Sequence, residues 1–426
     1  MAEIITFVIF IAELFVFLFL KINVVYALCV GLCLFIIYAF YKKFSFKEIF
    51  NMIKEGINGV KSVLFVFFFI GMITAVWRAG GTVPYIIYYS VKHINPTYFA
   101  FYAFLLCTMM SFLLGTAFGT AGTMGIICIS IARSLNLNEI LIGGAILSGA
   151  YFGDRCSPMS SSAILISDIT DTDLYNNIKN MLKTAFIPFL ISCLIYFILG
   201  KNTKSEIDFS AINALENEFV LNHIVFIPAL IVIILSLCKV SVKKTMLISI
   251  ISGILICFFV QKNDIREIFK ILWRGYRPDY NSIMSGGGII YMSQAFFTVG
   301  ISSTYFGFFK NTELLNPFTT LVDKLKVHMS SFSVLFILSL IISLFSCNQT
   351  LAIMLSCQIG KNLFKDKNSL ALSLENTAAL LPVLIPWNIS GRVPLDTIEV
   401  SMYSIFYSFF IFAVPLWNMF KNKTKA

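Results

Sequence analysis

An aspartate at the end of an apolar run is the first residue of this 426-residue chain that is placed to do chemistry. Asp154 closely follows the apolar run 139–152, and Pro158 stands four positions further on. Because proline has no backbone N–H, it frees a carbonyl oxygen within a helix. An ionisable group in such a run is energetically costly and is therefore a functional candidate, since one carboxylate can hold either a proton or a small cation. The alternative is a structural ion pair between Asp154 and Arg155 at the mouth of a loop.

A second candidate is the stretch Gly115–Gly125, in which nine of eleven residues are Gly, Ala or Thr. One interpretation is close helix packing, because Gly115 and Gly119 have the G-x-x-x-G spacing. The functional interpretation is that the glycines allow unwinding at membrane depth, which exposes carbonyl and hydroxyl oxygens. Hard cations prefer such oxygen ligands.

Similar polar breaks occur in the second half of the chain, at Ser346–Thr350 and Glu375–Asn388. They follow the first-half breaks by roughly 220 to 230 positions and supply amide, hydroxyl and carboxylate oxygens. Two half-sites of this kind can meet near the middle of a bilayer and form one cavity. The predicted ion- or substrate-binding residues are Thr116, Thr120, Thr123, Asp154, Ser157, Asn348, Gln349, Thr350, Glu375, Asn376, Thr377 and Asn388, with Asp154 and Glu375 as the cation-binding carboxylates.

The composition indicates which elements position these residues. Apolar residues make up 58% of the chain, charged residues only 13%, and the mean hydropathy is +0.85. Soluble proteins carry about 25% charged residues, so a water-soluble enzyme is excluded. Since a spanning helix needs about 20 apolar residues, we expect an all-α polytopic membrane protein with about 10–12 transmembrane helices. Several apolar runs are shorter than one crossing, which predicts discontinuous helices or re-entrant hairpins.

A repeat divides the chain. The sequence Lys47–Phe50 (Lys-Glu-Ile-Phe) returns as Arg266–Phe269 (Arg-Glu-Ile-Phe), and Gly56 returns as Gly275 at the same spacing of 219 residues. Each copy lies in a mixed apolar and charged segment, 44–60 or 263–281, which we expect to be an amphipathic interface helix. Chance recurrence is the alternative. The expected domains are a first transmembrane repeat 1–200, a polar linker 201–221, a second repeat 222–420 and a basic tail 421–426.

The charge of the chain is explained by membrane topology. Lys and Arg number 32 against 22 acids, and the excess lies in short segments between apolar runs, such as 42–43, 239–244 and 421–425. The positive-inside bias of membrane proteins explains this placement of basic residues better than nucleic-acid binding does. It predicts a multi-pass protein of the plasma membrane with both termini in the cytoplasm and an inverted second repeat. Arg266, Lys270, Arg274 and Arg277 argue against the inversion, since it places them outside.

The ten cysteines are scattered, mostly within apolar runs, with no C-x-x-C pair and no histidine at ligand spacing. They are typical of small buried hydrophobes, so we expect no disulfide and no zinc site among them, and we expect no cofactor.

Four motifs together resemble the NhaC family of sodium/proton antiporters, within the ion transporter superfamily. They are Gly115–Gly125, Ser148–Pro158, Thr172–Leu174 and Ile385–Asn388, and the resemblance extends from about residue 50 to about residue 415. It implies a secondary transporter in which sodium and protons share the carboxylate site of Asp154 and Glu375. The superfamily also favours an elevator-like motion over a rocking one.

Two departures from the family pattern concern the charge of the site. The family usually has an acid where this chain has Ser161, and commonly has one after Glu375, where this chain has Asn376. A less negative cavity better tolerates a substrate carboxylate. The alternative function is therefore a sodium- or proton-coupled carrier of a small organic anion or amino acid.

An enzyme is the rival from another class, because intramembrane proteases also bury Asp or Ser in helices. The aspartyl signature G-x-G-D fails because Tyr151 stands at its first glycine, and the serine signature G-x-S-G fails at Ile146. A channel or scaffold is disfavoured by the duplicated breaks. We therefore expect a transporter whose partners are the lipid bilayer, sodium and protons, with a small carboxylate or amino acid as the alternative substrate, a homodimer left open and no nucleic acid.

Overall fold

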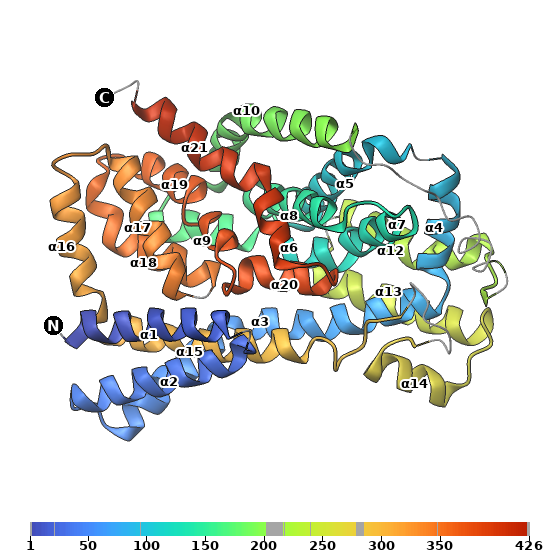
Figure 1. Cartoon of the computed structure of the whole chain (residues 1–426), viewed down its shortest axis with the longest axis horizontal. Helices are drawn as coiled ribbons and strands as arrows, with labels where there is room; N and C mark the ends of the chain where they lie inside the picture. Colours follow the sequence, from blue (N-terminus) through green and yellow to red (C-terminus); the bar gives the residue numbers. More distant parts are fainter. Residues whose placement is uncertain are drawn as a thin grey trace.

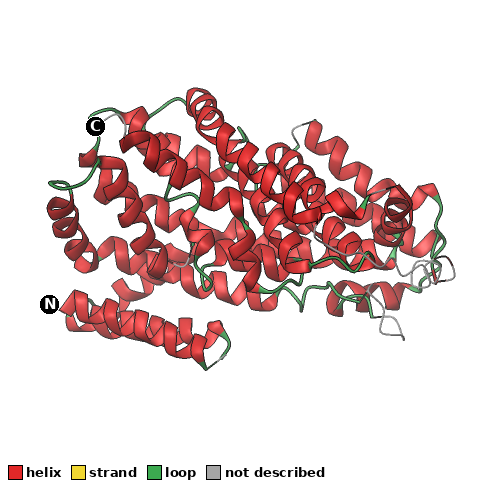
Figure 2. Cartoon of the chain, turned by 45° about the horizontal axis from the view of Figure 1, so that its top comes forward, coloured by secondary structure: helices red, strands yellow, loops and turns green. Residues whose placement is uncertain are grey.

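The computed structural model describes residues 2–20, 22–93, 95–201, 216, 218–238, 240–277, 285–346 and 348–423. Helices make up nearly all of this part of the chain (Figure 2), and its only β-type pairing is an isolated bridge between Tyr276 and Gly286. The all-α expectation is confirmed. Most of the expected linker 201–221 lies outside the described residues.

The helices of the first half end near residue 201. They are α1 (Ala2–Phe19), α2 (Val24–Tyr41), α3 (Phe46–Ala79), α4 (Thr82–His93), α5 (Phe99–Leu114), α6 (Ala117–Thr120), α7 (Ile126–Ser134), α8 (Glu139–Cys156), α9 (Ser161–Thr170) and α10 (Leu174–Lys201).

The second half supplies a similar number of helices. They are α12 (Ile227–Leu237), α13 (Val242–Phe259), α14 (Ile265–Arg274), α15 (Ser293–Asn311), α16 (Asn316–Leu325), α17 (Ser331–Ser346), α18 (Gln349–Gly360), α19 (Lys367–Asn376), α20 (Ile389–Thr397) and α21 (Phe409–Lys423). Because α21 continues to Lys423, the first residues of the expected basic tail are helical.

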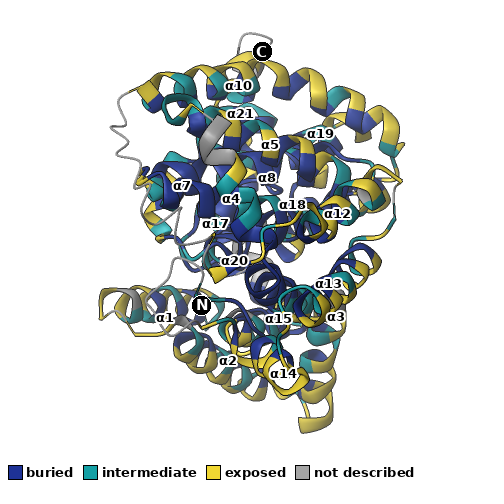
Figure 3. Cartoon of the chain, turned by 90° about the vertical axis from the view of Figure 1, so that its right-hand side faces the viewer, coloured by how far each residue is buried: buried dark blue, intermediate teal, exposed yellow. Residues whose placement is uncertain are grey.

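The helices form two layers (Figures 1 and 3). Helices α1, α2, α3, α13, α14 and α15 form the lower one in Figure 1, which we call the base layer. Helices α5 to α10 and α17 to α21 lie above it and form the upper body. All the polar breaks predicted from the sequence belong to the upper body.

Several helices are apolar and long enough to cross a membrane. Four of them qualify singly among the described residues: Pro96–Leu114, Ala117–Ser134, Leu174–Lys201 and Val242–Phe259. Two bent pairs qualify together, Leu64–Ala79 with Thr82–Tyr89 at 62° and Lys367–Leu384 with Ile389–Thr397 at 58°. The chain is therefore a polytopic membrane protein. The total of 10–12 crossings stays a prediction.

The repeated tetrapeptide begins a helix in both places. Ser45 caps α3 through a reciprocal pair of hydrogen bonds with Glu48, and Asp264, 219 positions later, caps α14 by accepting from Ile265 N at 2.8 Å. The two helices then differ. At Gly56 helix α3 continues, whereas at Gly275 helix α14 ends with a φ of 89°, which glycine adopts without strain. The segment expected as an interface helix at 44–60 is thus the first half of a 34-residue helix.

Close packing of α8 on α5 positions Asp154. A Cβ at Gly149 or Gly153 would meet the backbone of α5, so the two helices touch only because these residues lack one. The Ser111 hydroxyl also donates to the Ala150 carbonyl. Asp154 is therefore held beside the end of α5, where the first polar break begins.

Candidate functional site

The two halves of the chain each contain a helix break of the same shape. After α5, Gly115 adopts a φ of 67° and Thr116 is extended at φ −152° and ψ 132°. After α17, Asn348 is extended at φ −147° and ψ 155°. Thr116 and Asn348 are 232 positions apart, and each directly precedes a new helix. Each break therefore presents a helix N-terminus, whose first backbone N–H groups have no partner within their own helix, inside the upper body.

Asp154 lies between these two breaks. The backbone N–H of Ala117 donates to Oδ1 at 3.2 Å, and the Gln349 side chain donates to Oδ2 at 3.0 Å. The residue is only 5% exposed. Helix N-termini favour negative charge, so both breaks stabilise the carboxylate where it stands.

The loop after α8 fixes the backbone of Asp154. The hydroxyls of Ser160 and Ser162 both donate to the Asp154 carbonyl oxygen, the second at 2.7 Å. Ser157 accepts from Met159 N at 3.1 Å through its own hydroxyl oxygen. Ser157, a predicted site residue, thus stabilises the loop, and its neighbours Ser160 and Ser162 have the closer contact with Asp154.

A cavity of about 410 Å³ opens between the base layer and the upper body beside Asp154. The upper body contributes most of its polar lining, which is Thr116, Asp154, Ser161, Asn348, Gln349, Thr350 and Ser390. The base layer contributes Val60, Val66, Val299, Ser241, Val242 and Lys243. Five of the twelve predicted site residues therefore share one cavity: Thr116, Asp154, Asn348, Gln349 and Thr350.

Glu375 is completely buried, and neither of its carboxylate oxygens has a hydrogen-bond partner. It does not line the cavity beside Asp154. Asp154 and Arg155 are the charged groups within electrostatic range of it. A buried carboxyl group without donors is costly, and such exceptions mark functional sites or sites of bound water or ions.

Arg155 does not pair with Asp154, so the structural ion pair considered from the sequence is wrong. Its guanidinium is 1% exposed and donates to the Glu375 carbonyl at 3.0 Å and to Thr184 Oγ1 at 3.0 Å. It also donates to the Asn376 side-chain oxygen. These two consecutive residues of α8 therefore make different contacts. Asp154 contacts the two helix breaks, whereas Arg155 contacts the end of α19.

A second cavity, of about 610 Å³, lies on the Arg155 side of this core. Its walls include Asn376 and Thr184, the two side chains that accept from Arg155. Serine hydroxyls line much of the remainder, at Ser330, Ser331, Ser369 and Ser373. Asn376 is thus brought to a polar cavity, but not to the one that holds Asp154.

The remaining predicted residues bond to nearby backbone. Thr120 and Thr123 donate to carbonyls four residues earlier, at 2.9 and 2.7 Å, and Thr377 does the same at 2.7 Å. Asn388 caps α20 and donates to Ser343 O at 3.2 Å. The stretch expected to unwind over Gly115–Gly125 leaves the helical path only at residues 115–116, and 121–125 form a π-helical turn.

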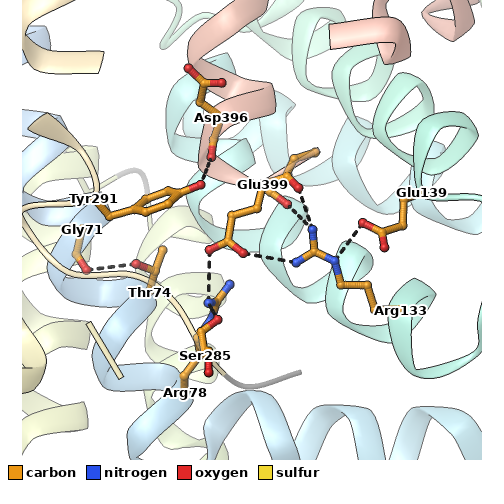
Figure 4. A network of polar contacts seen from close by, with 10 residues as sticks. Gly71, Thr74, Arg78, Arg133, Glu139, Ser285, Tyr291, Asp396 and Glu399 are labelled. Atoms are coloured by element: carbon orange, nitrogen blue, oxygen red, sulfur yellow. Dashed lines mark hydrogen bonds and ion pairs between the residues drawn. The ribbon is translucent and has the colours of Figure 1, made fainter. Parts of the chain in front are cut away.

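An ionic network joins the two layers (Figure 4). Glu399, just after α20, accepts from Arg78 at 3.2 Å and from Arg133 at 3.4 Å. Arg78 ends α3 of the base layer and is 3% exposed, whereas Arg133 belongs to the upper body and also pairs with Glu139 at 2.9 Å. Sequence reasoning missed this network, although a charge after a long apolar run was a visible signal at Arg78.

Sequence reasoning also missed Lys243 and Ser390 as cavity residues. No local pattern marks them, because they reach the cavity only through the packing of α13 and α20. Within the described part of the chain, no three His, Cys, Asp or Glu side chains cluster as metal ligands do. Besides Lys243, the cavity offers one carboxylate and uncharged oxygens, and these oxygens are ligands suited to a weakly held hard cation.

Comparison with known proteins gives one family. The model of the Na+/H+ antiporter family matches residues 2–168 and 149–418. The Na(+)/H(+) antiporter NhaC of Alkalihalophilus pseudofirmus is 27% identical over 419 residues, covering 94% of this chain and 90% of that protein. The malate-2H(+)/Na(+)-lactate antiporter of Bacillus subtilis is 28% identical over 378 residues, covering 85% and 80%. The arginine/ornithine antiporter ArcD of Halobacterium salinarum is 25% identical over 385 residues, covering 86% and 79%.

Proposed function

The chain belongs to the Na+/H+ antiporter family, and we propose that it exchanges sodium ions for protons at Asp154. The observation that carries this proposal is the position of that carboxylate. It is buried, it accepts one hydrogen bond from each of two helix breaks, and it lines a cavity between the two layers. Broken helices with a carboxylate between them are a common way to build an ion site in secondary transporters.

Competition for one carboxylate explains how exchange is coupled. A sodium ion stripped of water needs oxygen ligands and a compensating negative charge, which ionised Asp154 supplies. A proton on the same carboxyl group neutralises it equally well. An ionised and empty Asp154 is costly to carry through apolar surroundings, so the site changes sides only when it holds sodium or a proton.

The cavity residues divide the remaining work. The Gln349 side chain orients the carboxylate, because it donates both to Asp154 and to the Ala379 carbonyl at 2.8 Å. Thr116, Asn348 and Thr350 line the cavity and provide uncharged oxygens for sodium. Glu375 is the second carboxylate of the site, and it influences Asp154 through the electrostatic interaction between the two side chains.

The architecture we propose has two inverted repeats, about 1–200 and 222–420, with both termini in the cytoplasm and the protein in the plasma membrane. Its support is the pair of helix caps 219 positions apart and the pair of extended breaks 232 positions apart. Since the cavity lies between the layers, the upper body would move against the base layer to expose Asp154 to each side in turn.

A second candidate function is the sodium-coupled transport of a small organic anion or amino acid. The observation in its favour is Lys243, which lines the same cavity as Asp154. The Lys243 ammonium lies 5.8 Å from the centre of the Phe65 ring, and turned into the cavity it would pair with a carboxylate that binds together with a cation. Ser161 and Asn376, which stand where acids are usual, lower the negative charge further.

Purified protein in liposomes with an internal pH dye separates these functions. A sodium gradient alone is imposed first, and malate, lactate, arginine and ornithine are then added singly. Sodium-driven proton movement without any organic solute supports the antiporter. Silence until one organic solute is present contradicts it and supports the carrier. Liposomes with Asp154→Asn protein provide the control for leakage.

A further inference from the structure

Helix α14 lies at the edge of the base layer and is largely exposed (Figure 3). Ile268 and Ile271 are buried against α3 and α13 and anchor the helix. Phe269 and Trp273 instead remain 69% and 56% exposed. Exposed tryptophan side chains on a membrane protein are typical of the region where lipid headgroups meet acyl chains.

An apolar groove of about 240 Å³ begins at Trp273. Phe67 and Phe68 of α3 form one wall, and Ile290, Phe296 and Phe297 from the start of α15 form the other. The only polar residue in its lining is Ser293. Such a groove offers no partner to a polar ligand but suits a hydrocarbon chain.

A row of positive charge runs beside this groove. Arg266, Lys270 and Arg274 recur every fourth residue of α14, which places them along one face of the helix, and all three are exposed. None of them pairs with an acid among the residues that the structure describes. Trp273 belongs to the groove and adjoins this row, so an apolar surface and a cationic surface meet along one helix.

We propose that the groove binds an anionic phospholipid, with an acyl chain between α3, α14 and α15 and the headgroup phosphate on the Arg266, Lys270 and Arg274 row. Basic residues near a membrane surface attract anionic lipids, and the groove adds an apolar contact that fixes the position. A second copy of the chain fits less well. A twofold dimer through this face would set two basic rows against each other, which opposes association.

The site adjoins the network that joins the layers. Tyr291 lies in the turn beside the groove, and its hydroxyl donates to the Asp396 carbonyl of α20 at 3.1 Å (Figure 4). The Ser285 carbonyl, which precedes that turn, accepts from Arg78, the base-layer partner of Glu399. A lipid bound in the groove therefore stabilises the segment from Ser285 to Tyr291, which takes part in the contact between the two layers.

Lipid binding is tested on the full-length purified protein by thermal unfolding and native mass spectrometry, with dioleoylphosphatidylglycerol, dioleoylphosphatidylcholine and inorganic phosphate as separate probes. The variants are Arg266→Gln/Lys270→Gln/Arg274→Gln and Trp273→Ala. A matched control, Lys326→Gln/Lys361→Gln/Lys365→Gln, removes the same charge from exposed positions elsewhere.

Phosphatidylglycerol is expected to raise the unfolding temperature of the wild type and the control by several degrees, and to remain bound in the mass spectrum. The α14 triple variant should bind it at least fivefold more weakly, and Trp273→Ala should weaken it as well. Equal stabilisation by phosphatidylcholine or by phosphate would overturn the proposal. So would undiminished binding by the triple variant, or a lipid-free dimer that Trp273→Ala dissociates. None of these readouts depends on sodium/proton exchange.

Discussion

The Gln349 side chain lies 3.0 Å from Asp154 Oδ2 and connects the two halves of the chain at a single carboxylate. The same nitrogen lies 2.8 Å from the Ala379 carbonyl, so one amide group spans α8, the start of α18 and the turn after α19. A substitution at Asp154 therefore changes hydrogen bonds in both halves of the chain.

Replacing Asp154 by asparagine should abolish exchange while the protein still folds. Asn keeps the volume and accepts the same hydrogen bond from Ala117, but it can neither bind a proton nor neutralise sodium. We expect transport in liposomes to fall at least a hundredfold. Asp168→Asn, at an exposed position of α9, is the matched control and should transport normally. Normal transport by Asp154→Asn, with an unchanged pH profile, would make Asp154 a structural residue.

Gln349→Leu should weaken sodium activation without preventing insertion into the membrane. The substitution keeps most of the volume but removes the donor to a buried carboxylate, and such a loss costs about 1–3 kcal/mol. That corresponds to roughly a five- to hundredfold higher sodium concentration for half-maximal exchange. Gln358→Leu, on the exposed side of the same helix, is the control. An unchanged sodium dependence would remove Gln349 from the site.

The sequence predicts unwinding over Gly115–Gly125, and the backbone leaves the helix only at the start of that stretch, at residues 115 and 116. Gly115, a glycine before a polar residue in an apolar run, predicts a break, and the left-handed φ of that residue produces one. The direction of the Thr120 and Thr123 hydroxyls, in contrast, could not be predicted from the sequence. A threonine in a helix can always donate to the carbonyl four residues earlier, so its type and spacing do not reveal where the hydroxyl points.

Long-range partners are the other limit of sequence reasoning. Glu399 meets Arg78 across 321 positions of chain, and Lys243 reaches the cavity only because α13 packs on α3. No local pattern encodes either contact. The fold class, in contrast, follows from composition and apolar run length alone, because a bilayer permits few kinds of spanning structure.

Glu375→Gln tests whether the second carboxyl group contributes to cation binding. Because neither oxygen has a donor in the structure, the amide preserves the shape, breaks no hydrogen bond and removes the ability to carry charge. We expect normal folding and about a tenfold rise in the sodium concentration needed for half-maximal exchange, the effect of about 1.4 kcal/mol. Glu216→Gln, at an exposed position remote in sequence from the helix breaks, should leave this value unchanged. Wild-type sodium dependence of Glu375→Gln would limit Glu375 to a structural role.

Glu399→Gln should loosen the contact between the two layers. It removes the charge that compensates buried Arg78, and an unpaired buried charge destabilises a protein by about 3–5 kcal/mol. Since Glu399 is partly exposed, we expect a smaller loss of about 1–3 kcal/mol, measured by unfolding in detergent. Glu139→Gln removes only the more exposed partner of Arg133 and should change stability by less than about 1 kcal/mol. Equal effects of the two substitutions would contradict a special role for Glu399.

Lys243→Gln decides which substrate the cavity is built for. Lys243 and Asp154 line one cavity, so the ammonium group repels sodium but attracts a carboxylate. If sodium and protons are the substrates, the substitution should leave exchange intact and lower the sodium concentration for half-maximal activity by about two- to tenfold, since a repulsion of about 0.4–1.4 kcal/mol is removed. Lys244→Gln, at the exposed next position outside the cavity lining, should change nothing and controls for the loss of surface charge. If a carboxylate travels with the cation, Lys243→Gln should instead raise the required concentration of that organic solute at least tenfold, and this result would contradict simple sodium/proton exchange.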